Sequence, residues 1–189
     1  MTSVLIALLL GLHLSFLWGR ISFFRIDGPT SAAVRLIEVS GTLSVAVGIA
    51  LVVNRHGASV WPDRAALMLV ALSALLFAWG VRTVGRHRLT AAFSNDAPLE
   101  LITSGPFRYL RNPFYASYLL AHAVPVMASR SAWSWLPLVW MAAIYTRAAQ
   151  SEERKFLASP WAHDYRQYSA RAGRFFPRWP VAGGAPPWP

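Results

Sequence analysis

The chain has 189 residues, of which 55% are hydrophobic and only 14% are charged. Because soluble domains carry about 25% charged residues, this composition excludes an ordinary soluble protein and predicts one integral membrane domain. We place that domain at residues 1–180 and a flexible Pro/Gly-rich tail at residues 181–189. The chain has no cysteine, which excludes disulfides, thiolate metal sites and cysteine nucleophiles.

Apolar stretches of membrane-spanning length follow one another along the chain, a span taking roughly 20 residues. The first stretch lacks the basic start and small-residue cleavage site of a secretory signal, so we expect it to be retained. The last two are separated by a short turn at Arg130, which predicts an antiparallel hairpin. We therefore expect an all-α integral membrane protein with about five transmembrane helices at residues 4–19, 32–53, 65–81, 113–129 and 132–149.

The positive charges predict the orientation in the membrane, because Lys and Arg concentrate in cytoplasmic loops. With five spans and the N-terminus outside, the outer loops hold only Arg55, Arg64 and Arg130, and the other 15 of the 18 Lys and Arg residues lie on or near the cytoplasmic side. The C-terminus is then cytoplasmic. This distribution explains the net charge of +10 without nucleic acid, for which the sequence has no recognition motif.

Two histidines lie inside predicted spans, His13 in the first and His122 in the fourth. An ionisable residue within a membrane helix is a candidate functional residue by default. Neither histidine has a second metal ligand at helical spacing, so we expect no metal site. We interpret both as hydrogen-bonding groups between helices.

Two polar blocks flank the predicted hairpin. The first is "GPFRYLRNPFY", residues 105–115, and the second is "SEERKFL" followed by "DYRQY" and "RFFP", residues 151–177. Glu152 and Glu153 fall at the C-terminal end of a helix, where the helix dipole disfavours negative charge. Either Arg154 and Lys155 pair with them at a solvated helix end, or one glutamate turns inward and binds a cationic group of a ligand.

Together, the order and spacing of the two blocks resemble the isoprenylcysteine carboxyl methyltransferase and phospholipid methyltransferase superfamily of integral membrane enzymes. The resemblance covers about residues 103–177. It implies a methyltransferase that uses S-adenosylmethionine in a cytoplasmic pocket, with the lipid bilayer around it and a small or lipophilic acceptor. The matching residues are Gly105, Pro106, Arg111, Pro113 and Tyr115 in the first block, and Glu152, Glu153, Tyr165, Tyr168 and Pro177 in the second.

The resemblance also implies roles for single residues. A glutamate suits the amino group and ribose hydroxyls of the cofactor, an arginine its carboxylate, and a tyrosine its adenine or sulfonium. The expected catalytic residues are Arg111, Asn112 and Arg174, and Arg111, Arg171 or Arg174 would orient the acceptor if it is a carboxylate. The acceptor can be a carboxylate, a thiol or an amine, and no sequence feature chooses among them. The expected cofactor-binding residues are Gly105, Pro106, Arg111, Asn112, Pro113, Tyr115, Glu152, Glu153, Tyr165 and Tyr168.

Asn112 departs from the family, whose usual Arg-His-Pro reads Arg-Asn-Pro here. Asparagine can form hydrogen bonds but cannot act as a base. This difference leaves open a non-catalytic membrane protein that keeps the fold. A third alternative is an NADPH enzyme similar to membrane sterol reductases, whose additional spans the chain lacks.

Overall fold

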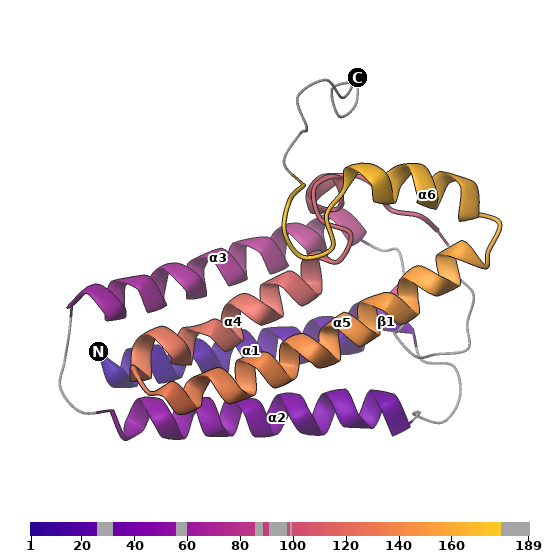
Figure 1. The fold of residues 1–189 in the computed structure, drawn as a ribbon. Coiled ribbons are helices and arrows are strands. Elements are labelled where there is room, and N and C mark those ends of the chain that lie inside the picture. The colour runs from indigo at the N-terminus through magenta and orange to yellow at the C-terminus, as the bar shows by residue number, and fades with distance from the viewer. Residues whose placement is uncertain (26–31, 56–59, 86–88, 91–97, 99, 179–189) are drawn as a thin grey trace.

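The structure is a computed structural model that describes residues 1–25, 32–55, 60–85, 89–90, 98 and 100–178. Its helices lie roughly along one direction as a bundle, with a short helix at one end (Figure 1). The predicted tail, residues 181–189, lies outside the described residues.

Three helices have the length and apolar character of membrane spans: α1 (Thr2–Phe23), α2 (Ala32–Val53) and α3 (Val60–Val84). They coincide with the first three predicted stretches, although α1 and α3 extend beyond the predicted ends. Most residues of these three helices are not buried inside the protein. This suits contact with lipid, because apolar side chains are stable in the bilayer and a helix forms its own backbone hydrogen bonds. The prediction of an all-α membrane protein is thus confirmed in its class.

The C-terminal helices α4 (Pro113–Ser129) and α5 (Trp135–Leu157) form the predicted hairpin and lie antiparallel in the bundle (Figure 1). Arg130 ends α4 with a left-handed backbone, at φ 56°, and the short 3-10 turn η2 (Ala132–Ser134) leads into α5. Helix α5 begins later than predicted and continues past Ala149. Among the described helices only α1, α2 and α3 qualify as spans by length and apolarity.

Helix α4 forms the centre of the bundle and contacts all four long helices. Its buried face is rich in small residues, which allow close helix packing in a membrane. Gly48 of α2 illustrates this closeness, because a Cβ there would lie 2.7 Å from the ring of Pro125. Rings of Phe16, Phe77 and Tyr118 pack together on another side of α4.

A buried ion pair closes the end of the bundle that lies opposite the short helix. Arg55, after α2, pairs with Asp63 in the first turn of α3. The same guanidinium donates to the carbonyl of Ala128 at 3.1 Å and to the hydroxyl of Thr2 at 3.1 Å. These contacts join the ends of all four neighbouring helices, and we call this region the Arg55 end.

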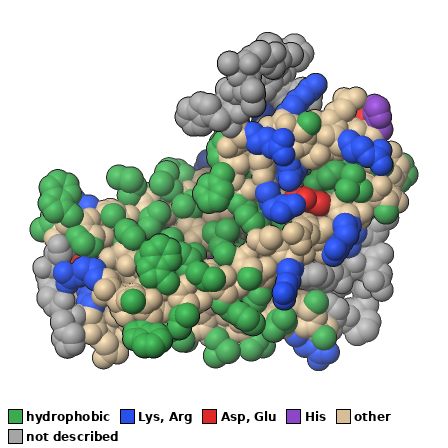
Figure 2. Space-filling model, in the orientation of Figure 1, with side chains coloured by type: hydrophobic (Ala, Val, Ile, Leu, Met, Phe, Trp, Pro, Cys, Tyr) green, Lys and Arg blue, Asp and Glu red, His purple; other side chains and the backbone are tan. Residues whose placement is uncertain are grey.

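The opposite end carries the polar blocks. It contains the 3-10 turn η1 (Gly105–Arg108) and the short helix α6 (Ala162–Arg171), and we call it the α6 end. Figure 2 shows hydrophobic side chains over the helical body and most of the visible Lys and Arg side chains at the α6 end. A two-residue parallel pair, β1 (Phe24–Arg25) with β2 (Leu89–Thr90), is the one departure from helix among the described elements.

Candidate active site

Gly105 begins the first polar block and fixes its path against α3. Its φ is 56°, a left-handed conformation that glycine adopts without strain. A Cβ at this position would lie 2.0 Å from Oγ1 of Thr83. The turn that follows buries Pro106 and Phe107. Gly105 and Pro106 therefore set the path of the loop where it packs against the end of α3.

Backbone hydrogen bonds join the first polar block to the segment after α6. The amide of Arg111 donates to the carbonyl of Gly173 at 2.7 Å, and the amide of Gly173 donates to the carbonyl of Tyr109 at 3.0 Å. The amide of Asn112 donates to the carbonyl of Arg174 at 3.2 Å. Residues about sixty positions apart in the sequence thus form a short parallel bridge.

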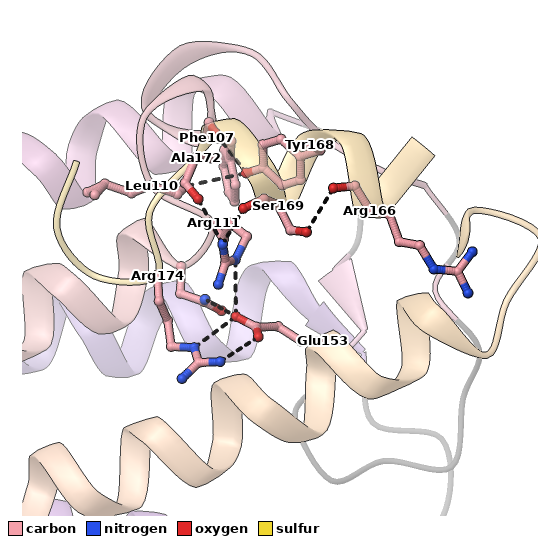
Figure 3. Close-up of polar contacts among 10 residues, drawn as sticks. Phe107, Leu110, Arg111, Glu153, Arg166, Tyr168, Ser169, Ala172 and Arg174 are labelled. Carbon is pink, nitrogen blue, oxygen red and sulfur yellow. Dashed lines mark hydrogen bonds and ion pairs between the residues drawn. The ribbon is translucent and has the colours of Figure 1, made fainter. Parts of the chain in front are cut away.

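Glu153 lies where the two polar blocks meet, and its carboxylate accepts hydrogen bonds from Arg111 and Arg174 (Figure 3). Arg174 donates from Nε to Oε1 at 3.0 Å and from Nη2 to Oε2 at 2.7 Å, a two-point contact. Arg111 donates from Nε to Oε1 at 3.2 Å. Burial acts to raise the pKa of Glu153, but the hydrogen bonds and charges of the two arginines outweigh burial and hold this pKa below its ordinary value. We call these three residues the Glu153 clamp.

Arg111 also caps α6. Its Nη1 donates to the carbonyl of Ser169 at 2.9 Å and to the carbonyl of Ala172 at 2.8 Å. A cation there satisfies carbonyls that the helix end leaves without intrahelical partners and interacts favourably with the helix dipole. The side chain of Arg111 is only 9% exposed, so its charge is held inside the protein by these contacts.

Two tyrosines of α6 anchor that helix to the rest of the α6 end. Tyr168 donates from its hydroxyl to the carbonyl of Phe107 at 2.7 Å (Figure 3). Tyr165 stacks on Phe156 of α5, with the ring centroids 5.0 Å apart. Both tyrosines are buried, and burial raises the pKa of each hydroxyl above its ordinary value. Their predicted contact with a cofactor stays a prediction.

Glu152 has a different environment from its neighbour. Its Oε1 accepts a hydrogen bond from the hydroxyl of Tyr115 at 2.8 Å. Burial raises the pKa of Glu152 to about 7, although the Tyr115 hydrogen bond and the charge of Lys155 act in the opposite direction. The ring of Tyr115 stacks on Tyr145 of α5, with centroids 5.2 Å apart. Glu152 is thus a carboxylate at the edge of an aromatic cluster.

Asn112 is buried beside Glu153, with only 7% of its surface exposed. Its Nδ2 lies 3.5 Å from Oε1 of Glu153, the long limit of a hydrogen bond. Pro113 follows as the first residue of α4, where its missing N–H costs nothing. The predicted catalytic residues Arg111, Asn112 and Arg174 therefore lie together around Glu153.

Two aromatic neighbours of Tyr115 were not predicted from the sequence. Tyr118 lies one turn after Tyr115 on α4, and its ring contacts that of Tyr115 at 6.2 Å and that of Tyr145 at 5.7 Å. The spacing of Tyr115 and Tyr118, at i and i+3, indicates that they share a helix face. No comparable signal in the sequence connects either residue with Tyr145.

The fold and this site define a class: a helical membrane protein with buried carboxylates, arginines and tyrosines at one end of its bundle. Among the described residues, no group of His, Cys, Asp or Glu is arranged to hold a metal ion. The sequence model of the phospholipid methyltransferase family matches residues 63–164, more than half of the chain. The chain therefore belongs to the phospholipid methyltransferase family, a family of membrane methyltransferases.

The matched region confirms the resemblance and changes its extent. It begins at Asp63 in α3, well before the first polar block, and includes both Glu152 and Glu153. It ends before Tyr165, so the α6 tyrosines and the Arg174 side of the clamp lie beyond the match. No individual curated protein matches the chain.

Proposed function

We propose that the protein transfers a methyl group from S-adenosylmethionine to a small or lipophilic acceptor at the cytoplasmic face of the membrane. The observation that carries this proposal is the pairing of Glu152 with Tyr115 beside the arginine-bound Glu153. It brings the two family blocks together at one end of the bundle. S-adenosylmethionine supplies an activated methyl group on a sulfonium, so the chain has only to bind, orient and exclude water.

The residues of the α6 end suit such a cofactor. Glu152 accepts its hydrogen bond from a phenol, and an ionised carboxylate in this position suits a cationic amino or sulfonium group. Tyr115 and Tyr145 add aromatic surface, which attracts cations and stacks with adenine. Glu153, by contrast, is already neutralised by two guanidinium groups. We therefore assign the cofactor contact to Glu152 and the assembly of the pocket to Glu153.

Arg111 and Arg174 then act as positioning residues. Both donate to Glu153, and Arg111 also holds the end of α6. Asn112 lies between them with its amide near the same carboxylate. In this arrangement the arginines fix the loop and the C-terminal segment around the cofactor.

The charges of the site favour an amine or thiol as the acceptor nucleophile over a carboxylate. A carboxylate acceptor needs a nearby cation, and the two arginines of the site are bound to Glu153. An amine or thiol must lose a proton, and Asn112 cannot take it. In its ionised form Glu152, whose pKa is raised to about 7, is suited to accept that proton.

The topology follows from the same proposal. Helices α4 and α5 cross the membrane as a hairpin in addition to α1, α2 and α3, with the N-terminus outside and the α6 end in the cytoplasm. The basic residues of the α6 end then face the cytoplasmic leaflet, as the positive-inside rule requires. The acceptor reaches the site from the bilayer and the cofactor from the aqueous side.

Binding and turnover measurements test the proposal. Isothermal titration calorimetry of the purified protein should detect S-adenosylmethionine and S-adenosylhomocysteine but not NADPH. Labelled methyl transfer should then be found within a panel of phospholipid amines, small thiols and prenylated cysteine carboxylates. Binding of NADPH alone would favour the reductase, and cofactor binding without transfer to any class would favour the non-catalytic alternative.

A pair of variants tests the assignment of the glutamates. Glu152→Gln should lower the affinity for S-adenosylmethionine about tenfold or more, since a charge-assisted bond contributes roughly 1.5–3 kcal/mol. Asp164→Asn removes one carboxylate from the exposed side of α6 and should leave the affinity unchanged. Equal affinity in the parent and Glu152→Gln would remove Glu152 from the cofactor site.

A further inference from the structure

A small polar pocket lies inside the bundle, among the residues of four helices. His13 lines it from α1, Ser44 from α2 and His122 from α4, and Pro137 of α5 closes it. The remaining lining is apolar: Leu9, Val45, Ile49, Ala121 and Pro125. The pocket has room for about one water-sized group. It lies within the predicted spans and shares no residue with the methyltransferase site.

The hydrogen bonds of His13 define what its free nitrogen requires. Nδ1 lies 2.8 Å from the carbonyl of Leu9, and because a carbonyl only accepts, Nδ1 must carry the proton. In the neutral ring Nε2 is then an acceptor. This atom is buried and has no hydrogen-bond partner among the described residues. Whatever pairs with it must donate a hydrogen bond.

Two further groups offer polar contacts at the pocket. Ser44 Oγ lies 3.0 Å from Nδ1 of His122, and this hydroxyl has both donor and acceptor capacity. The pocket thus combines one acceptor that needs a donor, Nε2 of His13, with a hydroxyl that can complete the bonding.

We propose that the pocket binds a single hydroxyl group, from one water molecule or from a membrane alcohol, which donates to Nε2 of His13 and bonds to Ser44. A ketone or an ether lacks the donor that Nε2 requires. A charged ligand is disfavoured, because no Asp, Glu, Lys or Arg is among the described residues that line the pocket and an unpaired buried charge is costly. The bound hydroxyl would link α1 to α2 inside the membrane.

Nitrogen-15 NMR of selectively labelled histidine tests this proposal on the full chain in nanodiscs. Five histidines are present, and loss of one signal in His13→Gln assigns His13. We expect the unprotonated Nε2 to resonate as a hydrogen-bonded nitrogen. In phosphatidylcholine discs, which offer no lipid hydroxyl, that result identifies water. A bonded resonance that needs added long-chain alcohol identifies the membrane alcohol. An unbonded Nε2 in both preparations would overturn the proposal.

A matched pair of serine variants tests the bridge. Ser44→Ala should shift the Nε2 resonance of His13, because it removes one partner of the bound hydroxyl. Ser15→Ala is the control, since the Ser15 hydroxyl is exposed and donates to the carbonyl of Gly11 on its own helix. A His13 resonance that does not move in Ser44→Ala would exclude the bridge. These readouts do not depend on methyl transfer.

Discussion

Glu152 and Glu153 are consecutive on α5, yet their carboxylates have opposite environments. Glu152 accepts from the neutral hydroxyl of Tyr115, and its pKa is raised to about 7 by burial. Glu153 accepts from two arginines, and its pKa is held below the ordinary value. Adjacent carboxylates whose pKa values are pushed apart are suited to different tasks. The first is available to a ligand and the second holds the site together.

We expect Glu153→Gln to loosen the C-terminal segment without unfolding the bundle. Each charge-assisted hydrogen bond contributes roughly 1.5–3 kcal/mol, and the substitution weakens all of those at the clamp. Hydrogen–deuterium exchange should become faster at the amides of Arg111 and Gly173, whose bonds form the bridge. Asp164→Asn should leave this exchange unchanged. Protected amides in Glu153→Gln would show that the backbone bridge does not depend on the clamp.

The pH dependence of stability should separate the two glutamates. A carboxyl group whose folded pKa is raised stabilises the fold at low pH and loses that contribution as the pH rises from about 4.3 to about 7. The parent should therefore lose stability relative to Glu152→Gln over this range, by at most about 4 kcal/mol and less after allowance for its partial exposure. Thermal unfolding of both proteins at several pH values measures the difference. A constant difference would show that Glu152 titrates normally.

Glu153 should have the opposite dependence. Its lowered pKa means that its contribution is present above about pH 4.3 and is lost as the pH falls through the folded pKa. The amide of Asn112 donates to the carbonyl of Arg174. Its exchange, measured relative to an unprotected amide at the same pH, should thus become faster only in acid. The same measurement on Glu153→Gln should show no such acid step, and a step of equal size in both proteins would assign it to another group.

Asn112 should tolerate histidine better than aspartate. Its amide lies 3.5 Å from Glu153, so Asn112→Asp would place a second negative charge at a buried carboxylate and should weaken the clamp. Asn112→Ala should weaken cofactor binding by about 0.5–1.5 kcal/mol, the net value of a neutral hydrogen bond. Asn112→His supplies an N–H to the same oxygen and should keep cofactor binding. Calorimetry with S-adenosylmethionine compares the four proteins, and equal affinity in all of them would place residue 112 outside the site.

The ion pair at the Arg55 end should be a major contributor to stability. Asp63→Asn leaves the buried Arg55 without its counter-charge, and breaking a buried pair costs roughly 3–5 kcal/mol. The unfolding temperature in detergent should fall by several degrees. Arg64→Gln is the control, since Arg64 is the exposed neighbour. An equal, small effect of both substitutions would show that the pair is dispensable.

Cysteine labelling tests the proposed orientation, and the absence of native cysteine makes single substitutions specific. A cysteine at exposed Val60 should react with an impermeant reagent added to intact cells. A cysteine at exposed Ala170, on α6, should react only after the membrane is opened. The reverse pattern would invert the topology, and labelling of both from outside would mean that the helices between them do not place the two ends on opposite sides.

The membrane class, the first three spans and the family could be predicted from the sequence, because these depend on local information. Apolar runs such as residues 32–53 satisfy a bilayer whatever their neighbours are, and the helix satisfies its own backbone. The family blocks are likewise contiguous, so their spacing is visible in one dimension. The predicted hairpin followed from the shortness of the turn at Arg130.

The partners of the individual side chains were decided only by the tertiary structure. The sequence offers the glutamate pair two adjacent cations, Arg154 and Lys155, and predicts no contact of Glu153 with Arg111 or Arg174. The structure selects Arg111 and Arg174 for Glu153, because the bridge from Leu110 to Gly173 brings both to one side of α5.

The division between Glu152 and Glu153 has the same origin. Successive residues on a helix point about 100° apart, so one carboxylate faces the tyrosines between α4 and α5 and the other faces the segment after α6. Identical side chains thus acquire different pKa values from burial and from the charges around them. The sequence by itself determined that two carboxylates lie near the end of a long helix, and only the packing of distant segments decided which one is neutralised.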